Sequence, residues 1–289
     1  MPELPEVETV RRTLEPVLTG RTLKRVAIED GRLTRPYDPV HIAAELQGER
    51  VSAVDRRGKY LILRFASGRA LLVHLRMTGS FHVDEEPSHE RAVATLDDRT
   101  RVSYRDVRRF GTWLLLEPDE VAPYLDAKVG EEPFDALFTV AHLGERIRKR
   151  KAPIKSALLD QRTLAGLGNI YTDEALWWAR IHPLRPAESL ERDEVRHLHR
   201  AIRRALERGI KRQGADLGDG VYRGGRMQKE FKVYGREGEP CDRCGTPIAK
   251  TRVAGRGTWF CPTCQPERPA QAASSSARRP SRSRRHSSV

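Results

Sequence analysis

Short apolar runs that alternate with polar residues dominate the chain between residues 21 and 116. The segments with this pattern are TLKRVAI, VSAVD, YLILRF, ALLVHL, VATL, TRVSY and TWLLL. Stretches with turn-forming residues, such as ASGR and LDDRT, separate several of them. Regular short strands joined by tight turns predict an antiparallel sandwich or barrel in this part of the chain.

A helical pattern replaces the β pattern from about Asp135 onward, and it is clearest in SLERDEVRHLHRAIRRALERGI. We expect Ser189 to cap this helix, because a serine hydroxyl can accept a hydrogen bond from a backbone N–H of the first turn. The apolar residues with the spacing of one helix face are Leu190, Leu198, Ile202, Ala205 and Leu206. The chain is therefore predicted to hold a β half and an α half, with GEEP at 130–133 as the linker.

A further amphipathic helix is predicted near the N-terminus, where one face can pack on the β half. Its apolar positions are Val7, Val10, Leu14, Val17 and Leu18.

Length and charge narrow the class of protein. The 289 residues suffice for two domains, and the formal net charge is +13. Residues 266–289 hold six Arg and one Glu, so residues 1–265 still carry +8. This excess favours a polyanionic partner, with nucleic acid first. The tail itself is rich in Ser, Ala, Pro and Arg and is expected to be disordered.

Neither a membrane segment nor a secretion signal is apparent. No run of eighteen apolar residues occurs, and the N-terminus lacks a charged-then-apolar pattern. We expect a cytoplasmic protein with no membrane partner.

All four cysteines fall in two C-x-x-C pairs separated by sixteen residues, namely Cys241, Cys244, Cys261 and Cys264. Four thiolates complete the closed tetrahedral shell of a structural zinc site, so we predict one structural Zn²⁺. Two disulfides are the alternative, which the predicted compartment disfavours. Lys250, Arg252 and Arg256 lie between the pairs, on a predicted β-hairpin that can present cations to phosphates.

The segment AGLGNIYTDEALW, residues 165–177, places two glycines before a helix start. Open backbone N–H groups and the helix dipole attract an anion there, and Asn169 can add a side-chain donor. A phosphate site is the functional interpretation, and an ordinary turn is the structural one.

Several residues in the β half are candidates for contact with DNA. Lys59 is expected to start a strand after Gly58, and His74 to end one. Met77, Arg108 and Phe110 are expected in loops or at strand ends, from which they could enter a duplex as a wedge. Core packing is the alternative for Met77 and Phe110, and a buried imidazole is the alternative for His74.

The chain opens with MPELPEVETV, where removal of Met1 would leave Pro2 with a free secondary amine. An α-amino group has a pKa of about 7.7–8.0, so a useful fraction is neutral and nucleophilic near pH 7. Attack on a sugar aldehyde carbon would give an iminium ion, and Glu3 could exchange protons beside it. The alternative is that PELPE is only a helix start, with Pro5 in the first turn.

Taken together, these motifs closely resemble the bacterial formamidopyrimidine-DNA glycosylase family (8-oxoguanine DNA glycosylase/AP lyase). The stretches that carry the resemblance, in order from residue 1 to about 265, are MPELPEVETVRR, RRGKYL, HLRMTGS, DVRRFG, IKSALLDQRTLAGLGNIYTDEALW, VYGREGEPC and the two C-x-x-C pairs.

The resemblance implies a multidomain α+β protein that holds damaged double-stranded DNA, as a monomer, between its two halves. We expect an antiparallel β-sandwich catalytic domain with an N-terminal helix at 1–130 and a helix-two-turns-helix domain at 134–235. A four-cysteine zinc finger is expected at 236–265, followed by the disordered tail at 266–289. The loop GADLGDGVYRGGRMQKEF matches the region that closes over an extruded base.

The resemblance also implies residue roles. Pro2 resembles the Schiff-base nucleophile and Glu3 the proton donor, while Lys59 and Arg256 resemble the proton donors for β- and δ-elimination. The expected DNA-binding residues are His74, Met77, His89, Arg108, Phe110, Arg150 and Asn169. Among them Met77, Arg108 and Phe110 match the triad that fills the void, whereas Asn169, together with Arg256, matches the grip on the lesion phosphates.

Two other functions remain open. An endonuclease VIII-like enzyme for oxidised pyrimidines is disfavoured because the chain opens with MPELPEVE rather than MPEGPE. A catalytically inert DNA-binding paralogue is disfavoured because Pro2, Glu3, Lys59 and Arg256 are retained together.

Overall fold

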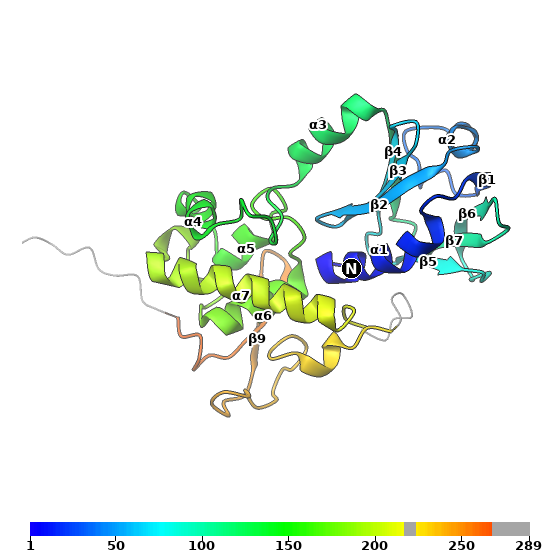
Figure 1. Ribbon diagram of the computed structural model, residues 1–289. Coiled ribbons are helices and arrows are strands. Elements are labelled where there is room, and N and C mark those ends of the chain that lie inside the picture. The colour runs from blue at the N-terminus through cyan, green and yellow to red at the C-terminus, as the bar shows by residue number, and fades with distance from the viewer. Residues whose placement is uncertain (217–223, 268–289) are drawn as a thin grey trace, which may run out of the picture.

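The computed structural model describes residues 1–216 and 224–267. Strands β1–β8 gather at one end and helices α4–α7 at the other, with the N-terminus between them (Figure 1). The predicted α+β class with a β half and an α half is confirmed.

The β half is a sandwich of two four-stranded sheets in which every pairing is antiparallel. The first sheet has the order β1-β6-β7-β5, formed by Leu23–Ile28, Glu90–Leu96, Arg101–Asp106 and Gly79–Val83. The second has the order β2-β3-β4-β8, formed by Val51–Arg57, Tyr60–Phe65, Ala70–His74 and Thr112–Leu116. Strand β5 was absent from the predicted set. In addition, Lys59 lies in the two-residue turn between β2 and β3 rather than at the start of β3.

The second sheet is buried on both faces, which explains the unbroken apolar runs of β3 and β4. Leu61 and Leu63 point into the sandwich core together with residues of the first sheet, whereas Ile62 points to the opposite face. There it packs with Val121 and Leu125 of helix α3, Pro118–Lys128. Because successive strand residues face opposite sides, a strand covered on both sides must be apolar throughout.

Helix α1, Leu4–Leu18, joins the two halves of the molecule. Val7, Leu14 and Leu18 are buried in the sandwich core, as the sequence pattern predicted. Leu4 instead belongs to the core of the helical half. The first turn of the chain is therefore fixed on both sides. Helix α2, Pro39–Leu46, packs beside β1.

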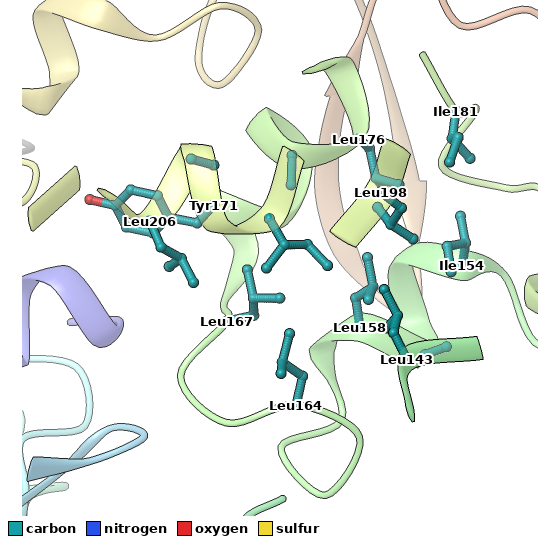
Figure 2. Close-up of a cluster of buried hydrophobic side chains, with 14 of the residues drawn as sticks. Leu143, Ile154, Leu158, Leu164, Leu167, Tyr171, Leu176, Ile181, Leu198 and Leu206 are labelled. Atoms are coloured by element: carbon teal, nitrogen blue, oxygen red, sulfur yellow. The ribbon is translucent and has the colours of Figure 1, made fainter. Parts of the chain in front are cut away.

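The helices that the structure describes in the helical half pack around one apolar cluster, whose side chains Figure 2 shows. They are α4, Val140–Arg148; α5, Ile154–Leu159; α6, Asn169–Ala179; and α7, Arg192–Lys211. Four residues of the predicted face, Leu198, Ile202, Ala205 and Leu206, are buried in α7, whereas Leu190 lies half-buried before the helix. The predicted cap is wrong. Glu191 begins the helix and forms a capping box with Glu194, while Ser189 ends the preceding 3-10 turn η1, Ala187–Ser189. In this capping box the two glutamate side chains accept hydrogen bonds from two backbone N–H groups of the first turn. Ser189 lies two residues before the N-cap position, too far away to accept either bond.

The C-terminal hairpin consists of β9, Ala249–Val253, and β10, Arg256–Phe260, which pair antiparallel as predicted. It packs against α6, and the 3-10 turn η2, Met227–Glu230, precedes it. Residues 217–223 of the predicted base-covering loop and residues 268–289 of the tail lie outside the described residues. Among the described helices, none is both long enough and apolar enough to cross a bilayer.

Candidate active site

The carboxylate of Glu3 lies at the N-terminus of α6. It accepts hydrogen bonds from the backbone N–H groups of Gly168 (2.8 Å), Ile170 (2.8 Å) and Tyr171 (3.3 Å). The side chain is 2% exposed, and a Cβ on Gly168 would lie 2.3 Å from its Cδ, so only glycine admits the carboxylate there. The backbone donors predicted to bind a phosphate therefore bind a carboxylate from the other half of the chain, as the helix dipole favours.

Glu6 and Tyr171 form a second buried polar contact between the halves, which the sequence did not reveal. The Glu6 carboxylate accepts hydrogen bonds from the Tyr171 hydroxyl and from the backbone N–H groups of Glu3 and Ala215, each at 2.8 Å. Figure 2 shows the Tyr171 hydroxyl pointing away from the apolar cluster. Burial is the largest effect on Glu6 and raises the pKa of its carboxyl. These contacts fix the N-terminal turn that carries Pro2.

Pro2 is buried directly before this turn, and Met1 precedes it half-buried. The backbone N–H of Leu4 donates to the carbonyl of Gly166 at 3.0 Å. The chain next to Pro2 is thus held in place rather than frayed.

Lys59 is 4% exposed and lies within electrostatic reach of Glu3 and Arg256. Burial, together with the Arg256 charge, lowers the pKa of Lys59 to about 8, although Glu3 and Glu6 favour its charged form. Gly58 has a φ of +58°, and a Cβ there would lie 3.3 Å from that of Ala165. The turn that carries Lys59 therefore packs closely on the loop before α6.

Arg256 is exposed at the start of β10, and the hairpin behind it is tied to α5 and α6. The ammonium group of Lys155, which is fully buried, donates to the Gly257 carbonyl (3.0 Å) and the Thr258 hydroxyl (2.8 Å) and pairs with Asp173 at 2.7 Å. Asn169 Nδ2 donates to the same Gly257 carbonyl at 3.0 Å. Lys155 and Asp173 were not singled out from the sequence, since nothing in IKSALL or YTDEAL distinguishes a buried ion pair from an exposed one.

The three predicted wedge residues come from two loops that lie side by side. Met77 is half-buried in the loop between β4 and β5, whereas Arg108 and Phe110 are exposed in the loop between β7 and β8. The Arg108 guanidinium stacks over the Phe110 ring, 4.8 Å from its centroid, and Phe110 is 51% exposed. The exposed ring and the guanidinium therefore form one stacked pair at the surface of this loop.

The remaining predicted DNA-binding residues occupy different settings. His74 is buried, its Nδ1 accepts the backbone N–H of Arg76 at 3.0 Å, and burial lowers its pKa to about 3. His89 is exposed with a φ of +62°. Arg150 pairs with Asp160 at 3.0 Å.

The four cysteines converge on one point, with all four sulfur atoms within 4.8 Å of one another. The Cys244–Cys261 and Cys241–Cys264 sulfur distances are 3.5 and 4.0 Å. A disulfide needs about 2.05 Å, so none is formed. Four thiolates at about 2.3 Å from one metal ion require sulfur separations of about 3.8 Å. The cluster therefore fits one structural zinc ion, as predicted.

Family models match nearly the whole described chain. The model described as Formamidopyrimidine-DNA glycosylase N-terminal domain matches residues 1–113, and that of the Formamidopyrimidine-DNA glycosylase H2TH domain matches 129–219. A zinc finger found in FPG and IleRS matches residues 238–266.

Curated relatives extend this similarity along the chain. A formamidopyrimidine-DNA glycosylase of Symbiobacterium thermophilum is 48% identical over 92% of this chain and 90% of its own length. That of Chloroflexus aurantiacus is 46% identical over 92% of this chain and 98% of its own length.

Solved structures of formamidopyrimidine-DNA glycosylases are also similar to this chain. Lactococcus lactis Fpg in complex with abasic-site DNA is 39% identical with a TM-score of 0.86, covering 92% of this chain and all of its own. MutM in complex with DNA containing carbocyclic 8-oxo-G is 40% identical with the same TM-score and coverage. Wild-type Lactococcus lactis Fpg in complex with DNA containing an oxidised pyrimidine matches equally well.

Proposed function

The chain belongs to the formamidopyrimidine-DNA glycosylase family, and from this premise we propose that it removes oxidised purines from duplex DNA. Its substrates are 8-oxoguanine and formamidopyrimidines, and it then cleaves the abasic site by β,δ-elimination. The enzyme is thus a bifunctional DNA glycosylase and lyase with a structural zinc finger.

In this reaction the secondary amine of Pro2, freed of Met1, attacks C1′ of the damaged nucleotide. The base leaves with the electron pair of the broken bond and takes up the proton that the amine releases. The ring oxygen takes a proton from Glu3 as the sugar opens, and an iminium ion forms on Pro2. Lys59 donates the proton for β-elimination and Arg256 the one for δ-elimination. The convergence of Glu3, Lys59 and Arg256 beside the fixed N-terminal turn is the observation that carries this assignment.

We assign DNA contacts to residues around this centre, which are exposed or half-exposed except for the buried His74. Asn169 and Arg256 hold the phosphates at the lesion, and the wedge residues Met77, Arg108 and Phe110 fill the void. Contacts by His74, His89 and Arg150 complete the set.

The proposed domains are the catalytic β-sandwich at 1–130, the helix-two-turns-helix domain at 134–235 and the zinc finger at 236–265. The protein acts as a monomer in the bacterial cytoplasm, on the nucleoid.

An oxidised pyrimidine is the second candidate substrate, because a similar structure binds DNA that contains one. The two substrate classes are separated by a panel of duplexes carrying 8-oxoguanine, a formamidopyrimidine or an oxidised pyrimidine. Excision of the two purine lesions should be fastest. A preference for the oxidised pyrimidine would reverse the assignment.

Glu3→Gln in the same assay should slow excision about a hundredfold or more, because a carboxamide cannot supply the proton. Glu117→Gln is the matched control, since Glu117 also begins a helix through a capping box but lies on α3. Equal losses in the two variants would assign Glu3 a capping role alone.

A further inference from the structure

We propose that Thr78 and Asp106 are positioning residues that join the two wedge-bearing loops into one rigid unit. The first loop comprises residues 75–78 and carries Met77, while the second comprises residues 107–111 and carries Arg108 and Phe110. Their side chains then enter the duplex together rather than one after another. This inference rests on the proposed function, because it assigns a device for base extrusion to the same enzyme.

A hydrogen-bonded chain connects the loops through the Thr78 hydroxyl. This hydroxyl donates to Oδ1 of Asp106 and accepts the backbone N–H of Arg108 at 2.9 Å. A threonine hydroxyl can do both at once. Thr78 directly follows Met77, so the group that fixes the backbone of Arg108 is one residue away from the third wedge side chain.

Asp106 is the fixed point of this chain of bonds, and it is only 1% exposed. Its second carboxylate oxygen accepts the backbone N–H of Gly111 at 2.7 Å, and its carbonyl accepts from Arg91 at 2.9 Å. The carboxylate thus binds the first loop through Thr78 and the far end of the second loop through Gly111. A buried carboxylate leaves no room for water to take over either bond.

The packing beneath the loops restrains them independently of these hydrogen bonds. The hydroxyl of Tyr104 lies under both, since a Cβ on Gly79 would approach it to 2.3 Å and one on Gly111 to 2.0 Å. Tyr104 is fully buried. Neither loop can therefore move closer to Tyr104, and movement of one loop changes the space available to the other.

The second loop is also held from its outer side. The guanidinium of Arg109 pairs with the carboxylate of Asp30, with Nη2 to Oδ1 at 2.8 Å, and Arg109 has a φ of +60°. Arg109 is therefore paired with Asp30, while Arg108 and Phe110 on either side of it are stacked on each other and exposed. An ordered wedge loses less conformational entropy on insertion than a flexible one.

The test compares single-turnover excision on an 8-oxoguanine duplex with cleavage of a preformed abasic duplex, where less unstacking is needed. A 2-aminopurine base beside the lesion reports wedge insertion. Thr78→Val should slow lesion excision and the insertion phase about tenfold more than abasic cleavage, because it removes the hydroxyl but keeps the shape. Thr78→Ser retains the hydroxyl and should restore the rate to within about twofold of wild type.

Thr34→Val is the matched control, because Thr34 is also a buried threonine of the β half whose hydroxyl donates to a carbonyl, that of Tyr37, at 3.0 Å. Its ratio of lesion to abasic rates should equal that of wild type. If Thr78→Val does not fold, Asp106→Asn serves instead, since it keeps the volume and should show the same selective loss.

An unchanged ratio in a folded Thr78→Val or Asp106→Asn protein would overturn the inference, and so would a failure of Thr78→Ser to rescue. These outcomes differ from failure of the proposed function, in which the wild-type chain itself would excise no lesion.

Discussion

Lys59 illustrates how burial alters the chemistry of a single side chain. Removal of its amine from water lowers the pKa to about 8, within reach of working pH, while Glu3 and Glu6 keep it from falling further. A lysine poised in this way can give up a proton near neutral pH, whereas an exposed lysine with a pKa of about 10.4 holds it more firmly.

The first prediction concerns the pH dependence of this group. If Lys59 acts as a proton donor, kcat/KM for abasic-site cleavage should be bell-shaped. It should rise up to about pH 8 as the Pro2 amine becomes neutral, and fall by about tenfold per pH unit above that as protonated Lys59 is lost. Lys59→Arg should be slower but should not fall between pH 8 and 9. Lys24→Arg, an exposed lysine in the same half, should retain the wild-type profile. A wild-type rate that does not fall above pH 9 would contradict this role of Lys59.

The residues that the sequence could indicate are those whose type is itself unusual at their position. Pro2 behind a methionine and the four spaced cysteines are examples. Glu6, Lys155 and Asp173 gave no such signal, because each has partners far along the chain. These are Tyr171 and Ala215 for Glu6, and residues 257–259 for Lys155 and Asp173. Burial of a charge is a property of the fold, and local sequence does not encode it.

At the scale of elements, α6 is the meeting point of the molecule. Its N-terminus binds Glu3, and Asp173 in its middle pairs with Lys155. Its C-terminal end contacts the four-cysteine zinc finger. There Trp177 donates its indole N–H to Cys241 Sγ at 3.4 Å, and the Arg243 guanidinium stacks on the same ring at 3.9 Å. The zinc site therefore holds the hairpin against the C-terminal end of α6. The same hairpin presents Arg256.

The second prediction follows from that arrangement. Cys244→Ser should lose zinc and bind lesion DNA about tenfold or more weakly, because the hairpin folds around its metal. Metal content by atomic absorption and DNA affinity by anisotropy measure the two effects. Thr251→Val, on the same hairpin but outside the metal shell, should change neither. One equivalent of zinc with unaltered affinity in the serine variant would rule out this ligand set.

Most elements followed from periodicity, but strand β5 and helices α2 and α3 were not predicted, and α4 and α5 were not predicted individually. Strand β5, GSFHV, begins with a glycine and has only two apolar residues, Phe81 and Val83, so its alternating pattern is too short to recognise. Helix α3 buries only Val121 and Leu125 in an otherwise polar stretch with an internal Pro123. The predicted cap of α7 was wrong because two glutamates, rather than the nearby serine, accept the backbone N–H groups of its first turn.

At the scale of the whole molecule, function depends on two halves that meet at the N-terminus. Glu3 and Glu6, from α1, bind the backbone and side chains of the helical half, and the wedge loops project from the β half. The resemblance indicated this architecture, but sequence could not show that Glu3 fills the anion site of α6, since that requires residues 165 positions apart to meet.

The third prediction concerns the wedge. Phe110→Ala should slow excision from an intact lesion duplex more than cleavage at a preformed abasic site, because extrusion costs a few kcal/mol of stacking and pairing. Arg108→Ala should in addition weaken discrimination over the base opposite the lesion, since a guanidinium can hydrogen-bond that base and a methyl group cannot. Equal losses on both duplexes, with opposite-base preference intact, would assign these side chains to general binding.

Borohydride trapping on a lesion duplex tests the central claim that the amine of Pro2 is the nucleophile. Reduction of the iminium ion should give a covalent protein–DNA adduct, which peptide mass spectrometry should locate on an N-terminal peptide that begins with Pro2. Pro2→Gly should reduce the trapped yield by about tenfold or more, because a primary amine replaces the secondary one. An adduct located on a lysine, or full activity in a chain that still carries Met1, would contradict the account.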